Sequence, residues 1–105
     1  MRVYIAGPMT GYEDHNFPAF HRAEELLKSM GHEVVSPARL SEHIFETVVN
    51  PTWADFMRHD IPALLECDAI YILRGWARSK GANLEVQIAR AFGFVFFQEG
   101  SGVGL

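Results

Sequence analysis

The sequence predicts an α/β fold: a single three-layer α/β/α domain with a mainly parallel sheet of four to five strands, flavodoxin-like or Rossmann-like. Short apolar runs alternate along the chain with longer segments in which apolar residues recur every three or four positions. Strands that alternate with helices form parallel sheets with right-handed crossovers. The 105 residues suffice for one hydrophobic core, so we expect one domain over residues 1–105.

Four apolar runs are the expected strands: residues 3–6, 33–36, 68–73 and 94–97. The first run is apolar throughout, which is typical of a strand covered on both faces. Pro37 is expected to end the second strand. The Gly-rich tail at residues 99–105 is expected to be flexible.

The first helix is expected to begin after Asn16, which can cap it, with Pro18 in the first turn and Gly31 at its end. Residues 39–51 show only a weak amphipathic pattern around Ile44, so we assign no element there.

Two further helices have clear start signals. Thr52 and Asp55 have the spacing of a capping box, and Pro62 is expected to kink the helix that follows them. Ser79 is a suitable cap for the last helix, and Gly93 is expected to end it.

Composition excludes several classes of function. The formal net charge is −4 and the nine Lys and Arg residues are scattered, which argues against a nucleic-acid polymer as partner. No run reaches the ~20 apolar residues of a membrane span. The single cysteine, Cys67, fits a reducing cytoplasm and a buried apolar role. The five histidines lack metal-ligand spacing, so we expect no metal and no cofactor.

Two carboxylates fall on faces that should be apolar. In the last helix, Glu85 lies opposite a polar face and is flanked by Gly81, Ile88, Ala89 and Phe92. In the helix before it, Asp60 lies within the apolar stripe, four residues after Phe56. A buried carboxylate is costly unless it is paired or used. The sequence therefore predicts a site between the two helices.

Other residues converge on the same edge of the sheet. Ligands of such folds bind beyond the carboxyl ends of the strands, where the 7–11 loop, Asp60 and the 74–79 loop should meet. The helix start at Ser79 favours an anion, and Trp76 is a candidate contact for a base or ring. Two structural explanations stay open: a core ion pair for Glu85 and a cap near Pro62 for Asp60.

Five segments carry a family resemblance: VYIAGPMTG at 3–11, MRHDI at 57–61, CDAI at 67–70, GW at 75–76 and SKGANLE at 79–85. On these motifs the chain resembles the nucleoside 2-deoxyribosyltransferase-like superfamily, and most of all its small, often phage-borne branch. It is more distantly similar to the deoxynucleoside 5'-monophosphate N-glycosidases.

The resemblance implies roles for individual residues. Glu85 matches the nucleophile that attacks C1' of the sugar, Asp60 the residue that handles the leaving base, and Tyr4 the residue that orients the nucleophile. Ser79 matches a serine that holds a 5'-phosphate. The substrate-binding residues implied or expected are Gly7, Pro8, Met9, Ser79, Gly81 and Trp76.

The same resemblance implies a nucleoside or nucleotide substrate and a homodimer or higher homo-oligomer. The first-loop arginine of the glycosidases is absent, which leaves Arg78 and Lys80 as candidate phosphate contacts. The expected function is cleavage or transfer of an N-glycosidic bond. The alternatives are a non-catalytic nucleotide-binding module and a glycohydrolase acting on NAD or a nucleotide signal.

Overall fold

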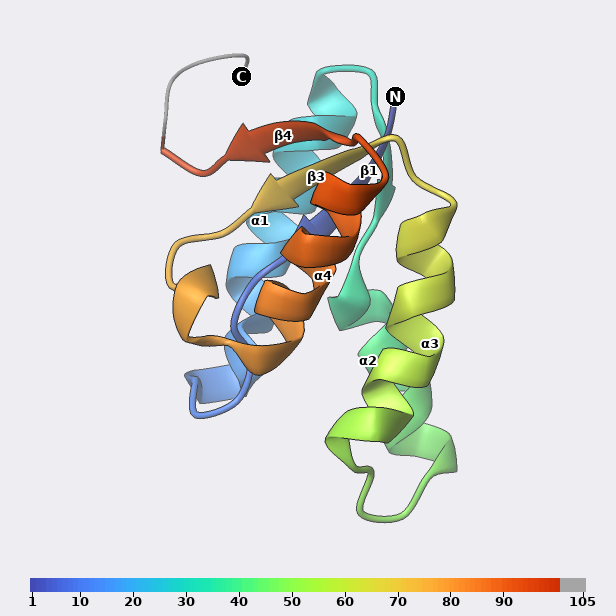
Figure 1. Cartoon of the computed structure of the whole chain (residues 1–105). Coiled ribbons are helices and arrows are strands. Elements are labelled where there is room, and N and C mark those ends of the chain that lie inside the picture. The colour runs from blue at the N-terminus through green and yellow to red at the C-terminus, as the bar shows by residue number, and fades with distance from the viewer. Residues whose placement is uncertain (101–105) are drawn as a thin grey trace.

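The computed structural model describes residues 1–100 and contains one parallel four-stranded sheet (Figure 1). The strand order is β2-β1-β3-β4, and all three neighbouring pairs are parallel. The strands are β1 (Arg2–Ala6), β2 (Glu33–Val35), β3 (Ala69–Ile72) and β4 (Val95–Gln98).

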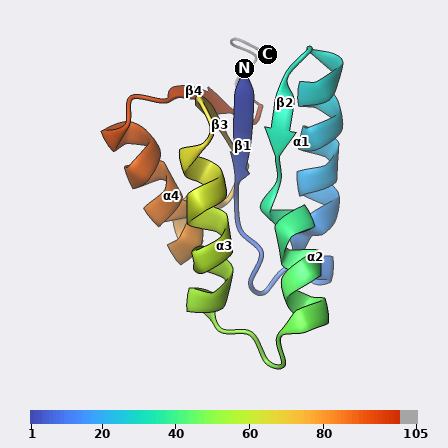
Figure 2. The same ribbon diagram turned by 90° about the vertical axis from the view of Figure 1, so that its right-hand side faces the viewer.

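Helices cover both faces of the sheet. They are α1 (Phe17–Ser29), α2 (Pro37–Thr47), α3 (Trp53–Leu65) and α4 (Lys80–Ala91), with short 3-10 turns η1 (Glu13–Asn16) and η2 (Trp76–Arg78). Figure 2 shows α1 on one side of the sheet and α3 and α4 on the other. Helix α2 follows β2 directly, so it lies beyond the carboxyl end of that strand. The predicted three-layer α/β architecture is confirmed.

The alternation of side chains along β1 builds two separate cores. Val3 and Ile5 pack with residues of α1, whereas Tyr4 and Ala6 pack with residues of α3 and α4. All four are fully buried, as expected for a central parallel strand. The hydroxyl-bearing ring of Tyr4 is thereby directed toward the helices that carry the two acids.

The predicted start signals of the last two helices are confirmed. The Thr52 side chain accepts a hydrogen bond from the amide of Asp55, and the Asp55 carboxylate accepts one from the amide of Thr52. The Ser79 hydroxyl accepts a bond from the amide of Ala82 at 3.1 Å. Each bond satisfies an amide that has no partner within its own helix.

Asn16 does not cap α1 as predicted. It occupies the N-cap position in a left-handed conformation (φ 61°), and its side chain makes no capping bond. Instead, Nδ2 donates to the carbonyl of Pro8 at 2.9 Å. Asp14 and His15 are also left-handed, so the chain turns sharply before α1, and Asn16 fastens the first loop.

Helix α2 lies where the sequence left most residues unassigned. Pro37 ends the strand, as predicted, but it is also the first residue of an eleven-residue helix whose buried face contains Ala38, Ser41 and Ile44. Proline suits this position because the first amides of a helix lack partners anyway. Pro37 therefore both ends the strand and begins helix α2.

Helix α3 continues through Pro62 to Leu65, so the proline does not end the helix. The kink expected at Pro62 stays a prediction. Phe92, expected beside Glu85 on the buried face, follows the end of α4 and is 66% exposed, so that expectation was wrong.

Of the predicted flexible tail, residues 101–105 lie outside the described part of the chain. Within residues 1–100, no helix has the length and apolar character to cross a bilayer.

Candidate active site

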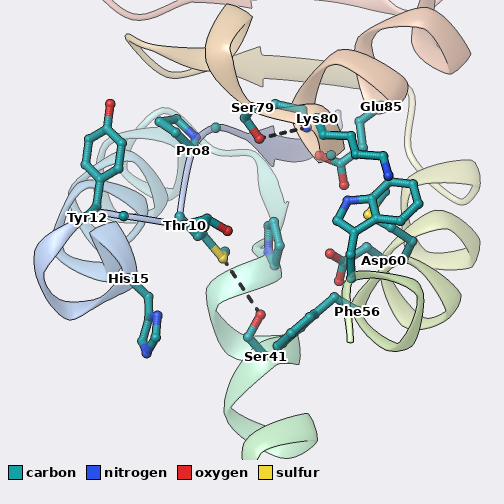
Figure 3. A pocket seen from close by; sticks show the side chains of 18 of the residues that line it. Pro8, Thr10, Tyr12, His15, Ser41, Phe56, Asp60, Ser79, Lys80 and Glu85 are labelled. Atoms are coloured by element: carbon teal, nitrogen blue, oxygen red, sulfur yellow. Dashed lines mark hydrogen bonds between the residues drawn. The ribbon is translucent and has the colours of Figure 1, made fainter. Parts of the chain in front are cut away.

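A cavity of about 840 Å³ opens beyond the carboxyl ends of the strands. Its walls come from the loop after β1, from α2, from the inner face of α3 and from the first turns of α4 (Figure 3). Both predicted acids, Asp60 and Glu85, line it. Cavities of this size accommodate ligands as large as nucleosides and nucleotides.

Glu85 lies on the buried face of α4 and is 4% exposed. The hydroxyl of Tyr4 donates a hydrogen bond to its Oε2. Burial raises the pKa of Glu85 well above its usual range, the bond from Tyr4 opposes this, and the nearby charge of Asp60 adds to it. The Tyr4 bond favours the ionised carboxylate, which is the nucleophilic form.

Asp60 is 6% exposed on the inner face of α3, and its Oδ1 has no hydrogen-bond partner. Burial raises the pKa of Asp60 to about 7. An unsatisfied buried oxygen is costly for the protein and is typical of a group that meets its partner in a ligand. The raised pKa keeps this carboxyl protonated at higher pH than an ordinary aspartate, so it can donate a proton near neutral pH.

The start of α4 presents positive charge to the cavity. Arg78, Ser79 and Lys80 line it, together with the free amides of the first helical turn. The Asn83 side chain donates to the carbonyls of Ala77 (2.9 Å) and Ser79 (2.8 Å), which ties the preceding loop to the helix. This end of the cavity is suited to an anionic group.

Aromatic rings form another wall. The ring of His15 stacks on Phe45 of α2, with centroids 5.0 Å apart and planes at 29°. Phe45 in turn meets Phe56 of α3 edge to face at 5.4 Å. All three side chains line the cavity, so it combines an apolar wall with the two buried acids.

The first loop approaches the site closely because of Gly7. A Cβ at this position would lie 2.7 Å from Cδ1 and 2.8 Å from Cβ of Leu73, which follows β3. Only glycine fits between the ends of the two strands without a shift. Gly7 therefore has a packing role as well as a place in the cavity wall.

The chemistry of this cluster is that of acids and a phenol. Two carboxyls with different surroundings lie at one end of a cavity, and a phenol orients one of them. Different surroundings give neighbouring carboxyls different proton affinities, which is the arrangement that acid and nucleophile roles require. Among residues 1–100, no group of three or more His, Cys, Asp or Glu side chains is placed to hold a metal ion.

The sequence matches the family model DUF4406, described as a domain of unknown function, over residues 1–97. The chain belongs to the DUF4406 family. No curated protein sequence matched it.

Solved structures match the DUF4406 chain over almost its whole length. A 2-deoxyribosyltransferase from Bacillus psychrosaccharolyticus superposes with a TM-score of 0.71 at 17% identity, covering 93% of this chain and 71% of the other. A 2-desoxiribosyltransferase from Leishmania mexicana gives 0.65 at 23% identity, covering 92% and 62%. The resemblance predicted from the motifs is therefore confirmed for the fold: the chain has a nucleoside 2-deoxyribosyltransferase-like fold.

Most of the site residues predicted for this DUF4406 chain lie at the cavity. Those in its wall are Gly7, Pro8, Met9, Asp60, Ser79, Gly81 and Glu85. Tyr4 lies behind the wall, in contact with Glu85. Trp76 does not line the cavity; it packs half-buried against the core beneath α4. Its position in a loop suggested ligand contact, but the ring is used for packing.

Several lining residues were not predicted as site residues. Trp53, Phe56 and Met57 precede Asp60 by seven, four and three positions, so the same helical spacing that identified Asp60 also pointed to them. Ser41 and Phe45 lie on α2. Neither could be placed at the site from the sequence, because α2 itself was not assigned.

Proposed function

We propose that this chain breaks the N-glycosidic bond of a nucleoside or nucleotide, deoxyribosyl or ribosyl, and passes the sugar to a second base or to water. The observation that carries the proposal is the meeting of Tyr4, Asp60 and Glu85 at one cavity, from three different elements. The confirmed fold and the matching motif residues support it.

In the first step, an Oε atom of ionised Glu85 attacks C1' of the sugar. The bond from C1' to the base nitrogen breaks, and its electron pair goes to the base. The result is a covalent glycosyl-enzyme, reached through a transition state with oxocarbenium character. Tyr4, which donates to Oε2, holds the attacking carboxylate in place.

Asp60 acts on the leaving base. Its protonated carboxyl donates a proton to the base nitrogen as the glycosidic bond breaks, so a neutral base departs. In the second step, the nitrogen of a new base or a water molecule attacks C1'. Asp60 accepts the proton of the incoming group, and Glu85 leaves as the carboxylate. Two displacements at one carbon give net retention of configuration.

The remaining wall residues bind the rest of the substrate. The rings of Phe45 and Phe56 offer the base an apolar surface. Ser79, Gly81, Arg78 and Lys80 are suited to the sugar and to a 5'-phosphate, if the substrate carries one. Gly7, Pro8 and Met9 also line the cavity and are expected to contact the substrate.

The test is release of free base, measured by chromatography. The panel contains deoxynucleosides, deoxynucleoside 5'-monophosphates, ribonucleotides and NAD, each with and without a second base. Release that requires the second base identifies a transferase, and release without it identifies a hydrolase. No release from any member, by a folded protein, contradicts the proposal.

The cavity volume favours a dinucleotide as a second candidate substrate. A space of about 840 Å³ exceeds what a single nucleoside fills, so a dinucleotide substrate is the second candidate. Release of nicotinamide from NAD, with no release from mononucleotides, would favour it. A binding module without chemistry predicts that nucleotides raise the melting temperature while no member of the panel loses its base.

We also propose that the chain forms a homodimer. Phe92, Val95 and Phe96 expose 66%, 41% and 37% of their surface, and the latter two belong to the edge strand β4. Exposed apolar side chains on an edge strand favour association. Light scattering should give twice the monomer mass, and Phe92→Glu should reduce it to that of a monomer.

A further inference from the structure

Helices α3 and α4 meet along a seam that leads from the cavity rim to the two acids. On α3, Trp53, Met57 and Asp60 follow one another at spacings of four and three residues, so they share one face. The first turns of α4, which also line the cavity, lie against this face. The seam therefore ends at the buried carboxyls.

The middle of the seam is closed by direct packing. A Cβ added at Gly81 would lie 3.4 Å from both Sδ of Met57 and Nε1 of Trp53. These are ordinary van der Waals distances, so the first turn of α4 lies directly against Trp53 and Met57 of α3. Met57 is buried, with 8% of its surface exposed.

The outer end of the seam is closed by a cation and a ring. The Nζ atom of Lys80 lies 3.9 Å from the ring centroid of Trp53. Lys80 forms no ion pair with any carboxylate among residues 1–100. Lys80 and Trp53 are each the first residue of their helix, so one contact joins the starts of the two helices that carry the acids.

Exposure changes abruptly along this seam. Trp53 is 42% exposed, whereas Asp60 and Glu85 are 6% and 4% exposed although both line an open cavity. Figure 3 shows Lys80 at the same end of the cavity as Glu85 and Asp60, with Tyr12 and His15 at the other end. The contact between Lys80 and Trp53 thus lies in the cavity wall, at the end where the two acids are buried.

We propose that Lys80 and Trp53 form a latch that closes the α3–α4 seam and keeps water from reaching the carboxyl pair along this seam. In the latch, Lys80 acts through Asp60 and is therefore a positioning residue. The inference goes beyond the proposed function, since it concerns the hydration of the empty site. It holds or fails whether or not a base is released.

The latch makes a prediction whose sign separates it from simple electrostatics. Removing the positive charge of Lys80 takes a cation away from the carboxyls, which on its own raises their pKa values. Opening the seam lets water reach Asp60, which lowers its pKa because burial is what raised it. A decrease therefore indicates the latch, and an increase indicates charge alone.

The experiment is a titration of the Asp60 carboxyl carbon by 13C NMR in the full chain without ligand. Tyr4 from β1, Glu85 from α4 and His59 on α3 are the titratable groups around it, so the Asp60 signal is assigned with Asp60→Asn. Lys80→Met and Trp53→Leu should each lower the pKa of Asp60 by about one unit, toward the ordinary value of a hydrated aspartate.

Two variants serve as controls. Lys80→Arg keeps a cation that stacks on indole, so the pKa of Asp60 should stay at its wild-type value. Arg90→Met removes the other cation of α4 that lies over a ring, Phe96 at 5.9 Å, far from the cavity, and should leave Asp60 unchanged.

The outcomes separate clearly. A lowered pKa in both latch variants, with Lys80→Arg and Arg90→Met like wild type, supports the latch. An unchanged or raised pKa in either latch variant overturns it, and so does an equal decrease in Arg90→Met. If the chain proves to release a base, Lys80→Met should also move the alkaline limb of the kcat/KM profile to lower pH.

Discussion

Tyr4 and Glu85 are 81 positions apart in the chain, and the hydroxyl of Tyr4 donates a hydrogen bond to Oε2 of Glu85. The bond joins the central strand β1 to helix α4, and both side chains are buried. Tyr4 is the only hydrogen-bond partner of the Glu85 carboxylate among the described residues. The orientation of the proposed nucleophile therefore depends on one phenol.

Replacing Tyr4 by Phe should lower kcat for base release about tenfold to a hundredfold. The change removes one hydrogen bond to a carboxylate, which contributes about 1.5–3 kcal/mol. The matched control is Tyr71→Phe: Tyr71 is also buried but packs in the core on the α1 side. Equal activities of the two variants would mean that Tyr4 has no role in orienting Glu85.

The rate of base release should decrease as the pH rises above about 7. Asp60 donates its proton in the first step, and burial raises its pKa to about 7. Well above that pH, the protonated fraction of Asp60 decreases about tenfold for each pH unit. The pH profile of kcat/KM measures this limb, and Asp60→Asn should remove the limb along with most of the activity. A limb that persists in Asp60→Asn belongs to another group.

Asp60→Asn should stabilise the fold, and only above acid pH. The pKa of Asp60 is raised from 3.8 to about 7 in the folded state, so the unfolded chain loses its proton first as pH rises. Wild type therefore loses stability between about pH 4 and pH 7, by up to about 4 kcal/mol relative to the variant, and the difference stays constant above pH 7. Urea unfolding at pH 4 and pH 8 measures it.

Asp55 offers a control of opposite sign for that experiment. Hydrogen bonds from the amide and hydroxyl of Thr52 lower its pKa. Its contribution to stability is present above the unfolded pKa and is lost as pH falls. Asp55→Asn should thus be less stable than wild type at pH 8 and closer to it at low pH. The same sign in both variants would contradict this assignment.

Gly7→Ala should destabilise the fold by about 1–3 kcal/mol, the usual cost of overpacking. The new methyl group would lie 2.7 Å from Leu73 Cδ1. Urea unfolding measures the loss. In a Leu73→Gly background the same substitution should cost less, because both Cδ1 and Cβ of Leu73, the two atoms nearest the new methyl group, are removed. Additive effects of the two changes would show that the clash is not the cause.

The sequence was sufficient for the features that depend on local spacing. The capping box of Thr52 and Asp55, the cap at Ser79 and the burial of Asp60 and Glu85 all follow from positions a few residues apart. Alternation of apolar runs and helical segments was enough for the parallel sheet.

The sequence was insufficient where the outcome depends on tertiary contacts. Asn16 could cap a helix or fasten a loop, and only the nearby carbonyl of Pro8 decides between them. Pro37 ends a strand and begins a helix with equal ease. Trp53 and Trp76 each precede one of the two acids by less than ten residues in the sequence. Only the fold shows that Trp53 lines the cavity and that Trp76 does not.

The central claim is that Glu85 attacks the sugar, and the most direct test compares wild type with Glu85→Gln. Both proteins receive the best substrate of the panel; base release is measured by chromatography, and binding by calorimetry. The glutamine keeps a carbonyl oxygen that can accept the bond from Tyr4 but is not a nucleophile. The account predicts similar binding and a loss of base release of about 10³-fold or more. Undiminished release by Glu85→Gln would contradict it.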